Sequence, residues 1–328
     1  MKVAVFSSKP FERIRLEKYN RGHALKFFSE RLNCETVKLT KGFDAVSVFS
    51  SDNIKTEVID NLHKAGVKLI LLRSAGHDNI DLEKATASGI KVAYVPDYSP
   101  YSVAEHTVLL MLALNRRLIQ AVRQIETNNF KLDNLIGFDM NGKTVGIIGL
   151  GNIGTVVAKI LSGMGCKILV YETNPKKSLS GKLNFQYVGL DYLLRNSDII
   201  TLHIPSNYEN KHIINKSTIA KMKKGVMLIN TARGNLINTY DLIDALKSGQ
   251  VGSAGLDVYE FEKGLYFEDH SAKMIQDDIF GLLRSFSNVL ITGHQGFLTD
   301  NALNNIAETT INNITNFENQ INLFHPLN

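Results

Sequence analysis

Short apolar runs alternate with helical patterns through the whole chain. In the first part, β-rich runs occupy residues 3–6, 35–39, 45–49, 68–72 and 91–95. A second series occupies residues 144–148, 166–171, 199–204, 226–230, 254–258 and 289–292. Strands separated by helices are typical of parallel sheets, because each parallel connection needs a crossover. The pattern therefore predicts an α/β chain with two doubly wound parallel sheets.

Three longer segments carry a helical apolar period, at residues 101–128, 153–164 and 299–323. Pro100 is well placed for the first turn of the first of these helices. The polar residues 141–143 suggest a crossing between domains, and a return crossing is expected near residues 293–297. If the last helix packs on the N-terminal unit, the first domain is discontinuous and the second is inserted within it.

Length and composition fit a soluble two-domain enzyme. The chain has 328 residues, 44% of them apolar and 21% charged, which is too long for one typical core. The net charge of +5 is spread thinly, and no Lys/Arg cluster interleaves with aromatics as in a nucleic-acid groove. No run reaches the roughly 18 apolar residues of a membrane span, and no signal-peptide pattern opens the chain. We therefore expect a cytoplasmic protein that binds neither nucleic acid nor membrane.

The two cysteines give no sign of a metal site. Cys34 and Cys166 lie inside predicted strands, and neither belongs to a Cys/His spacing that would hold zinc. We expect both to be buried, reduced thiols and expect no bound metal.

A glycine-rich turn joins the strand at 144–148 to the helix at 153–164. In the pattern G-x-G-x-x-G, Gly149 would permit the tight turn, Gly151 would let backbone N–H groups approach a pyrophosphate, and Gly154 would let the helix pack on its strand. The helix N-terminus would then face the phosphates with its partial positive charge. The turn predicts a dinucleotide site.

Glu172 stands at the end of the following strand, where a carboxylate can accept both ribose hydroxyls and repel a 2′-phosphate. This position favours NAD over NADP, although Lys176 and Lys177 follow closely and would partly offset the repulsion. The alternative interpretation is an ordinary solvated acid at a strand end.

Three polar residues follow successive strands of the second sheet, namely Arg233, Glu262 and His294. Ligands of open α/β sheets bind outside the carboxyl ends of the strands. Arg233 could hold a carboxylate bidentately, and His294 could transfer a proton near neutral pH. Glu262 could orient the imidazole, but Glu260 and Glu268 compete for that role and spacing does not choose among them. A surface salt bridge remains the alternative for Arg233.

In the first domain, the strand at 68–72 ends in small residues at 74–76, where consecutive N–H groups can form an anion-binding nest. If this nest faces Arg233, a small carboxylate would be held from both sides. A plain turn is the alternative interpretation.

Taken together, these segments resemble the NAD-dependent D-2-hydroxyacid dehydrogenases, and within that family the fermentative D-lactate dehydrogenases. The resemblance extends over essentially the whole chain. Its most specific stretches are residues 73–76, 95–100, 104–106, 230–234, 257–262 and 292–297. The segment 263–288 is similar to the D-lactate branch. Two positions depart from the pattern, since Glu172 stands where aspartate is commoner and His77 where a bulky or aromatic side chain is expected.

The resemblance implies a flavodoxin-like substrate domain of residues 1–100 and 297–328, with an inserted Rossmann NAD-binding domain of residues 101–296. It makes Arg233 the carboxylate clamp, Glu262 the partner of the imidazole, and His294 the acid/base. Besides the three glycines, the residues that it places around the coenzyme are Asn152, Ile153, Glu172, Ile204, Pro205, Asn210, Thr231, Ala232, Arg233 and Asp257. Ala75 and Gly76 would bind the substrate carboxylate together with Arg233 and His294, and Phe49, Tyr98 and Phe297 would wall the pocket.

The implied activity is reversible hydride transfer between NADH and pyruvate, which yields D-lactate. Two alternatives stay open: a reductase for larger 2-ketoacids such as phenylpyruvate, and a coenzyme-sensing regulatory protein. The resemblance also suggests a homodimer or a homotetramer.

Overall fold

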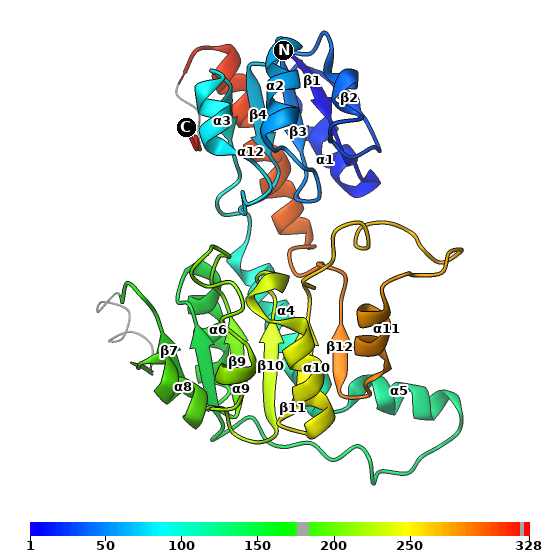
Figure 1. Cartoon of the computed structure of the whole chain (residues 1–328), viewed down its shortest axis with the longest axis vertical. Coiled ribbons are helices and arrows are strands. Elements are labelled where there is room, and N and C mark those ends of the chain that lie inside the picture. Colours follow the sequence, from blue (N-terminus) through cyan, green and yellow to red (C-terminus); the bar gives the residue numbers. More distant parts are fainter. Residues whose placement is uncertain (176–183, 322–324) are drawn as a thin grey trace. The chain divides into compact units, whose positions relative to one another are not determined.

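The computed structural model describes residues 1–175, 184–321 and 325–328. Contacts within the chain divide it into two units, Met1–Ser99 with Leu298–Asn328, and Pro100–Phe297 (Figure 1). The chain thus passes between the units beside residues 100 and 297. The expected crossing at residues 141–143 is wrong, since these residues lie inside the second unit. Lys176 and Lys177 lie outside the described residues.

The first unit contains a parallel sheet in the order β2-β1-β3-β4-β5, which is the flavodoxin-like order. Its strands are β1 (Lys2–Val5), β2 (Ala24–Phe27), β3 (Ala45–Val48), β4 (Leu69–Leu72) and β5 (Lys91–Ala93), and its helices are α1 (Pro10–Tyr19), α2 (Thr56–Lys64), α3 (Leu82–Ala87) and α12 (Asp300–Glu318).

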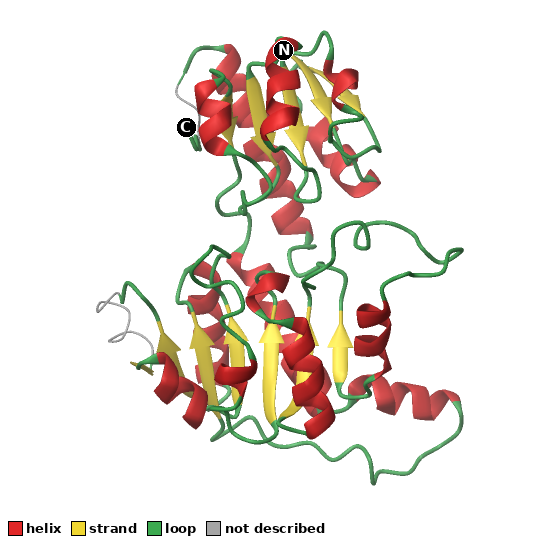
Figure 2. Ribbon diagram, in the orientation of Figure 1, coloured by secondary structure: helices red, strands yellow, loops and turns green. Residues whose placement is uncertain are grey.

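Helices cover both faces of this sheet (Figure 2). Leu16 of α1 and Ile311 of α12 pack with Val3 and Leu71 on one face. Helices α2 and α3 pack against the other face, where Ile59 contacts the cluster around Val46. The C-terminal helix therefore completes the core that the first 99 residues begin.

One predicted strand of the first unit is wrong and another was missed. Residues 35–39 were expected to form a strand, but Val37–Thr40 forms a 3₁₀ helix and the strand is β2. As an edge strand, β2 alternates only between exposed and half-buried positions, so it lacks the apolar run of a central strand. Cys34 is consequently exposed and not buried, with Sγ 3.3 Å from Glu57 Oε2, whereas Cys166 is buried as expected.

The second unit contains a parallel sheet in the order β12-β11-β10-β9-β6-β7-β8. Its strands are β6 (Thr144–Ile148), β7 (Lys167–Tyr171), β8 (Phe185–Tyr187), β9 (Ile199–Leu202), β10 (Val226–Asn230), β11 (Val251–Leu256) and β12 (Val289–Ile291). Its helices are α4 (Pro100–Asn115), α5 (Leu118–Glu126), α6 (Asn152–Gly163), α8 (Leu190–Asn196), α9 (Lys216–Ile219), α10 (Thr239–Ser248) and α11 (Asp278–Ser285). The strand order reverses between β6 and β9, which is the point where open α/β sheets bind ligands.

Alternate residues of the strands enter two cores on the two faces of this sheet. Val145 and Ile147 of β6 pack with α4 and α6, whereas Ile148 packs in the cluster that contains side chains of α8, α9, α10 and α11. All five residues of β10 are buried, as expected for a central parallel strand. The carboxyl ends of β6, β9, β10, β11 and β12 are thereby fixed at one edge.

The predicted helix over residues 101–128 is two helices. Arg117 has a φ of +50° and separates α4 from α5. Ten residues of α4 are buried, but α5 buries none. The apolar period did not show this break, because it falls at two arginines, which are good helix formers.

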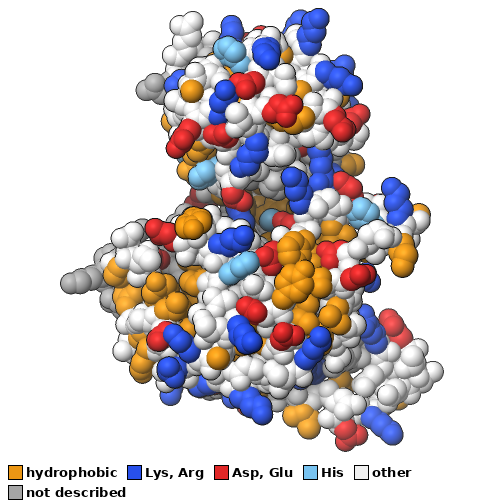
Figure 3. Space-filling view, viewed as in Figure 1, with side chains coloured by type: hydrophobic (Ala, Val, Ile, Leu, Met, Phe, Trp, Pro, Cys, Tyr) orange, Lys and Arg blue, Asp and Glu red, His pale blue; other side chains and the backbone are white. Residues whose placement is uncertain are grey.

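The described residues include no helix both long and apolar enough to cross a membrane. On the face drawn in Figure 3, Lys and Arg side chains are interspersed with Asp and Glu. This distribution agrees with the thinly spread charge of the sequence.

Candidate active site

The glycine-rich turn follows β6 and leads into α6, as its sequence predicts. Gly149 has a φ of +96°, and a Cβ there would lie 2.6 Å from the carbonyl oxygen of His203. A Cβ on Gly154 would lie 2.2 Å from the carbonyl oxygen of Gly149. Both glycines are therefore required by packing, whereas a Cβ on Gly151 would meet nothing within 4 Å. The backbone at Gly151 is open to an approaching group.

Glu172 lies beside this turn, at the end of β7. Its Oε2 accepts the N–H of Leu150 at 2.8 Å, and its Oε1 accepts the N–H of Asn174 at 3.1 Å. Burial alone would raise the pKa of Glu172, but these hydrogen bonds outweigh burial and lower it. The carboxylate is thus held ionised next to the N-terminal end of α6, whose N-cap Gly151 provides no side chain. An open backbone, a helix N-terminus and a fixed carboxylate together fit a dinucleotide.

The loop after β10 carries Arg233. The side chain of Asn230 accepts the N–H of Ala232 at 3.1 Å and donates to the carbonyl of Arg233 at 2.8 Å, so it closes the turn. A Cβ on Gly234 would lie 2.1 Å from the carbonyl carbon of Tyr259. The Arg233 loop therefore packs directly on the chain that leads to Glu262, and only glycine fits this contact. The Arg233 side chain is half-buried and donates from Nη1 to the carbonyl of Ala232 at 2.8 Å.

His294 and Glu262 form the central pair of this edge. Nδ1 of His294 lies 2.9 Å from Oε1 of Glu262, and their side chains are 21% and 26% exposed. The backbone N–H of Tyr259 donates to the other carboxylate oxygen at 3.0 Å, so Glu262 is fixed on both oxygens. Because Nδ1 is engaged, Nε2 is the ring nitrogen that remains for proton transfer.

The competing carboxylates have other partners. Oε1 of Glu260 lies 2.6 Å from Nε2 of His212, and its Oε2 accepts the N–H of Thr239 at 3.0 Å. Oε2 of Glu268 lies 3.8 Å from Nε2 of His270. Glu262 is the glutamate whose contact with His294 is described above.

Asp257 holds the segment that carries His294. Its Oδ1 accepts from the Thr292 hydroxyl at 2.6 Å and the N–H of Gln295 at 2.9 Å, and its Oδ2 accepts the N–H of Gly296 at 2.8 Å. Its backbone carbonyl accepts the N–H of His294, whose φ is +54°. Burial alone would raise the pKa of Asp257, but hydrogen bonds from His106, Thr292 and the two backbone groups lower it to about 2.

Sequence reasoning missed two contacts of α4, one with the segment that carries His294 and one with the turn that carries Arg233. Nε2 of His106, on α4, lies 3.0 Å from the Thr292 hydroxyl and 3.3 Å from Oδ1 of Asp257. Thr107 bonds Thr231 through their hydroxyls at 2.8 Å. A helical histidine and threonine carry no local signal of such contacts, because their partners are more than 120 residues away.

The other coenzyme candidates lie in neighbouring loops of the same unit. Ile204, Pro205 and Asn210 follow β9, where the Asn210 amide donates to the carbonyl of Pro205 at 2.6 Å. Asn152 and Ile153 begin α6. Thr231 and Ala232 belong to the Arg233 turn. Phe297, which was predicted to line the substrate pocket, is half-buried at the end of the same unit.

Four substrate candidates belong to the first unit. Phe49 follows β3 and is 4% exposed, and Tyr98 is half-buried. Ala75 and Gly76 follow β4, in a turn where the Ser74 hydroxyl donates to the carbonyl of Gly76 at 2.7 Å. Within the described residues, the N–H groups of Ala75 and Gly76 donate to no backbone acceptor.

The described residues contain no group of three or more His, Cys, Asp and Glu placed to hold a metal ion.

Comparison with known proteins identifies the family. The model of the "D-isomer specific 2-hydroxyacid dehydrogenase, NAD binding domain" matches residues 108–296, more than half of the chain. A 2-hydroxyacid dehydrogenase homolog of Haemophilus influenzae is 49% identical over 96% of this chain and 95% of its own length. The D-lactate dehydrogenase of Escherichia coli is 44% identical over 97% of both chains.

A solved structure described as the pyruvate reductase of Chlamydomonas reinhardtii aligns with a TM-score of 0.91 at 42% identity, over 99% of this chain and 98% of that one. The second unit thus matches the NAD-binding domain of the family, and the fold matches over 99% of the chain. The chain belongs to the D-isomer-specific 2-hydroxyacid dehydrogenases.

Proposed function

We propose that the protein is an NAD-dependent D-lactate dehydrogenase that reduces pyruvate to D-lactate, and that the reaction is reversible. The observation that carries this proposal is the contact between His294 and Glu262 at the edge that also bears Arg233 and the glycine-rich turn. A relative named D-lactate dehydrogenase, 44% identical over nearly all of the chain, supports the substrate.

His294 is the proposed acid/base. In its protonated form, Nε2 would donate a proton to the carbonyl oxygen of pyruvate while Glu262 stabilises the imidazolium through Nδ1. In the direction of lactate oxidation, neutral His294 would accept the hydroxyl proton. The bound NADH supplies the hydride that C2 of pyruvate accepts.

Arg233 is the proposed clamp for the substrate carboxylate, because a guanidinium can bind both carboxylate oxygens and fix the plane of the ketoacid. Within the first unit, we propose that the backbone N–H groups of Ala75 and Gly76 are substrate-binding groups. Phe49, Tyr98 and Phe297 would limit the space for the substrate side chain.

The coenzyme would bind along the carboxyl edge of the second sheet. Gly151, Asn152 and Ile153 would present backbone N–H groups to the pyrophosphate, with Gly149 and Gly154 shaping the turn. Glu172 would accept the adenosine ribose hydroxyls. Around the rest of the coenzyme we place Ile204, Pro205, Asn210, Thr231, Ala232 and Asp257.

We propose that the protein forms a homodimer or a homotetramer. The apolar side chains of α5 support this assembly, since Leu118, Ile119, Val122 and Ile125 are 48%, 42%, 50% and 56% exposed and contiguous apolar surface marks interaction sites. The free thiols of Cys34 and Cys166 suit a reducing compartment such as the cytoplasm.

The test is an NADH oxidation assay with pyruvate, with phenylpyruvate and without a ketoacid, followed by chiral analysis of the product. We expect rapid oxidation with pyruvate and D-lactate as the product. A preference for phenylpyruvate would identify a reductase for larger ketoacids. NADH binding without turnover on any 2-ketoacid would contradict the proposal and indicate a coenzyme sensor.

A further inference from the structure

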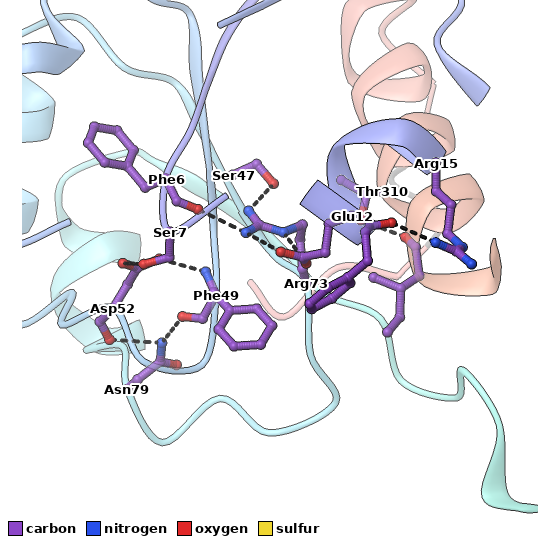
Figure 4. A network of polar contacts seen from close by, with 12 residues as sticks. Phe6, Ser7, Glu12, Arg15, Ser47, Phe49, Asp52, Arg73, Asn79 and Thr310 are labelled. Carbon is purple, nitrogen blue, oxygen red and sulfur yellow. Dashed lines mark hydrogen bonds and ion pairs between the residues drawn. The ribbon is translucent and has the colours of Figure 1, made fainter. Parts of the chain in front are cut away.

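A buried guanidinium lies at the start of the turn that contains Ala75 and Gly76. Arg73 immediately follows β4 and is 2% exposed. Its Nε donates to Oε1 of Glu12 at 2.9 Å, its Nη1 to the hydroxyl of Ser47 at 3.1 Å, and its Nη2 to the carbonyl of Phe6 at 2.8 Å (Figure 4). One side chain thereby joins α1, β3 and the end of β1 to the turn.

Glu12 is the counter-ion of this guanidinium. It lies in α1, is 5% exposed, and also receives Nη2 of Arg73 at 3.4 Å on its second oxygen. Removing two charges from water costs several kcal/mol for each ion, and a well-packed apolar pair of similar volume is often as stable. Stability alone therefore does not require an ion pair here.

The same region fixes Phe49 from three sides. The guanidinium carbon of Arg73 lies 5.8 Å from the centroid of the Phe49 ring, within the range of a cation–π contact. The backbone N–H of Phe49 donates to buried Asp52 at 2.6 Å, and its carbonyl accepts from the Asn79 amide at 3.1 Å (Figure 4). Asp52 also accepts from the hydroxyl of Ser7 at 2.6 Å.

We propose that Arg73 is a positioning residue for substrate binding, with Glu12 as the partner that holds it. The inference rests on the proposed function, in which the N–H groups of Ala75 and Gly76 are substrate-binding groups. Because the guanidinium donates in three directions, it fixes both the position and the orientation of the backbone that enters the turn. Arg73 acts through the N–H groups of residues 75 and 76, without touching the substrate itself.

The test distinguishes a role of Arg73 in positioning the turn from a role in the stability of the fold. The double variant Arg73→Met with Glu12→Met replaces the ion pair by apolar side chains, and Arg73→Lys keeps the charge but loses the planar fork. Leu62→Ala is the control, because Leu62 is fully buried in the same unit and belongs to the cluster of α2 on the other face of the sheet. For each variant, Tm, kcat and the KM for pyruvate and for NADH are measured.

We expect the double variant to raise the KM for pyruvate about tenfold or more, because small misplacements of binding groups have large effects, while the KM for NADH stays within about twofold. Arg73→Lys should give an intermediate value, and Leu62→Ala should lower Tm without changing either KM. An unchanged KM for pyruvate in the double variant, or in Arg73→Lys if the double variant does not fold, would overturn the inference. An equal rise in Leu62→Ala would do the same. If the wild-type protein reduces no 2-ketoacid, the proposed function itself fails, which the wild-type assay shows separately.

Discussion

Nε2 of His212 lies 2.6 Å from Oε1 of Glu260, two residues before the glutamate that contacts His294. The backbone N–H of His212 also donates to the carbonyl of Asn235 at 2.9 Å. This pair therefore connects the loops that follow β9, β10 and β11. It is a histidine–glutamate pair like that of His294 and Glu262. A variant of His212 is therefore a matched control for a variant of His294.

Replacing His294 with Gln should lower kcat for pyruvate reduction by about 100-fold or more, the usual contribution of a general acid. The KM for NADH should change little, because His294 is not proposed to bind the coenzyme. His212→Gln is the matched variant and should retain kcat within about threefold, since Gln can still donate to Glu260. Steady-state kinetics of the two variants decide the assignment, and equal losses would contradict it.

Arg233→Lys should raise the KM for pyruvate about tenfold or more, because an ammonium cannot bind a carboxylate in the bidentate geometry of a guanidinium. The loop should keep its fold, since Asn230 and Gly234 shape it through the backbone. Kinetics at saturating NADH measure the effect. A wild-type KM would exclude Arg233 as the clamp.

Gly151 and Gly154 should respond differently to alanine. A Cβ at position 154 collides with the carbonyl of Gly149, whereas one at position 151 meets nothing. Gly154→Ala should therefore lower Tm, and Gly151→Ala should leave Tm within about 2 °C, since its φ is −70° and suits alanine. Gly151→Ala should nevertheless weaken NADH binding, which fluorescence titration measures. Undiminished binding would mean that the coenzyme does not approach this backbone.

Asp257 should make the second unit sensitive to acid. Its folded pKa of about 2 lies below the ordinary value of 3.8, so its stabilising contribution is complete above about pH 4 and is lost as the pH falls towards 2. The difference in unfolding free energy between the wild type and Asp257→Asn should therefore shrink by about 2 kcal/mol over this range. Urea unfolding at pH 5 and at pH 3 tests the trend; between these two values about half of the change, roughly 1 kcal/mol, is expected, and a constant difference would contradict the prediction.

The exposed apolar side chains of α5 lead to a prediction about the assembly of the protein. Val122→Glu places a charge on this face and should shift sedimentation velocity towards the monomer. Ile14 in α1 is 66% exposed, so Ile14→Glu is the control and should leave the assembly unchanged. A wild-type protein that sediments as a monomer, or a Val122→Glu variant that stays assembled, would argue against the α5 interface.

Central strands were the most predictable part of the fold. The apolar run at residues 226–230 coincides with β10, because a strand that is buried on both faces consists almost entirely of apolar residues. The edge strand β2 and the short strand β8 were missed, since their side chains are partly solvated and carry no such run. The break at Arg117 was invisible, because arginine is a good helix former and the left-handed backbone at this position leaves no mark in the sequence.

For the candidate site, sequence patterns indicated which side chains follow the strands but not how they pair. The choice of Glu262 over Glu260 as the partner of His294 came from family resemblance; in the structure Glu262 contacts His294 and Glu260 contacts His212. The contacts of His106 with Thr292 and of Arg73 with Glu12 join residues that are distant in sequence. Such contacts become apparent only when the sheet order is known.

The discontinuity of the first unit has a consequence for synthesis. Its sheet is translated within the first 99 residues, but α12 is made last and supplies Ala307, Ile311 and Ile314 to the core beside Val3 and Leu69. Until α12 is made, only α1 can cover this apolar sheet face, so a ribosome-bound chain would leave part of the face exposed for some 200 residues of elongation, about 10 to 40 seconds at ordinary translation rates. During that interval the inserted unit can fold. The exposed apolar face of the nascent first unit is then the surface that we expect a chaperone to bind.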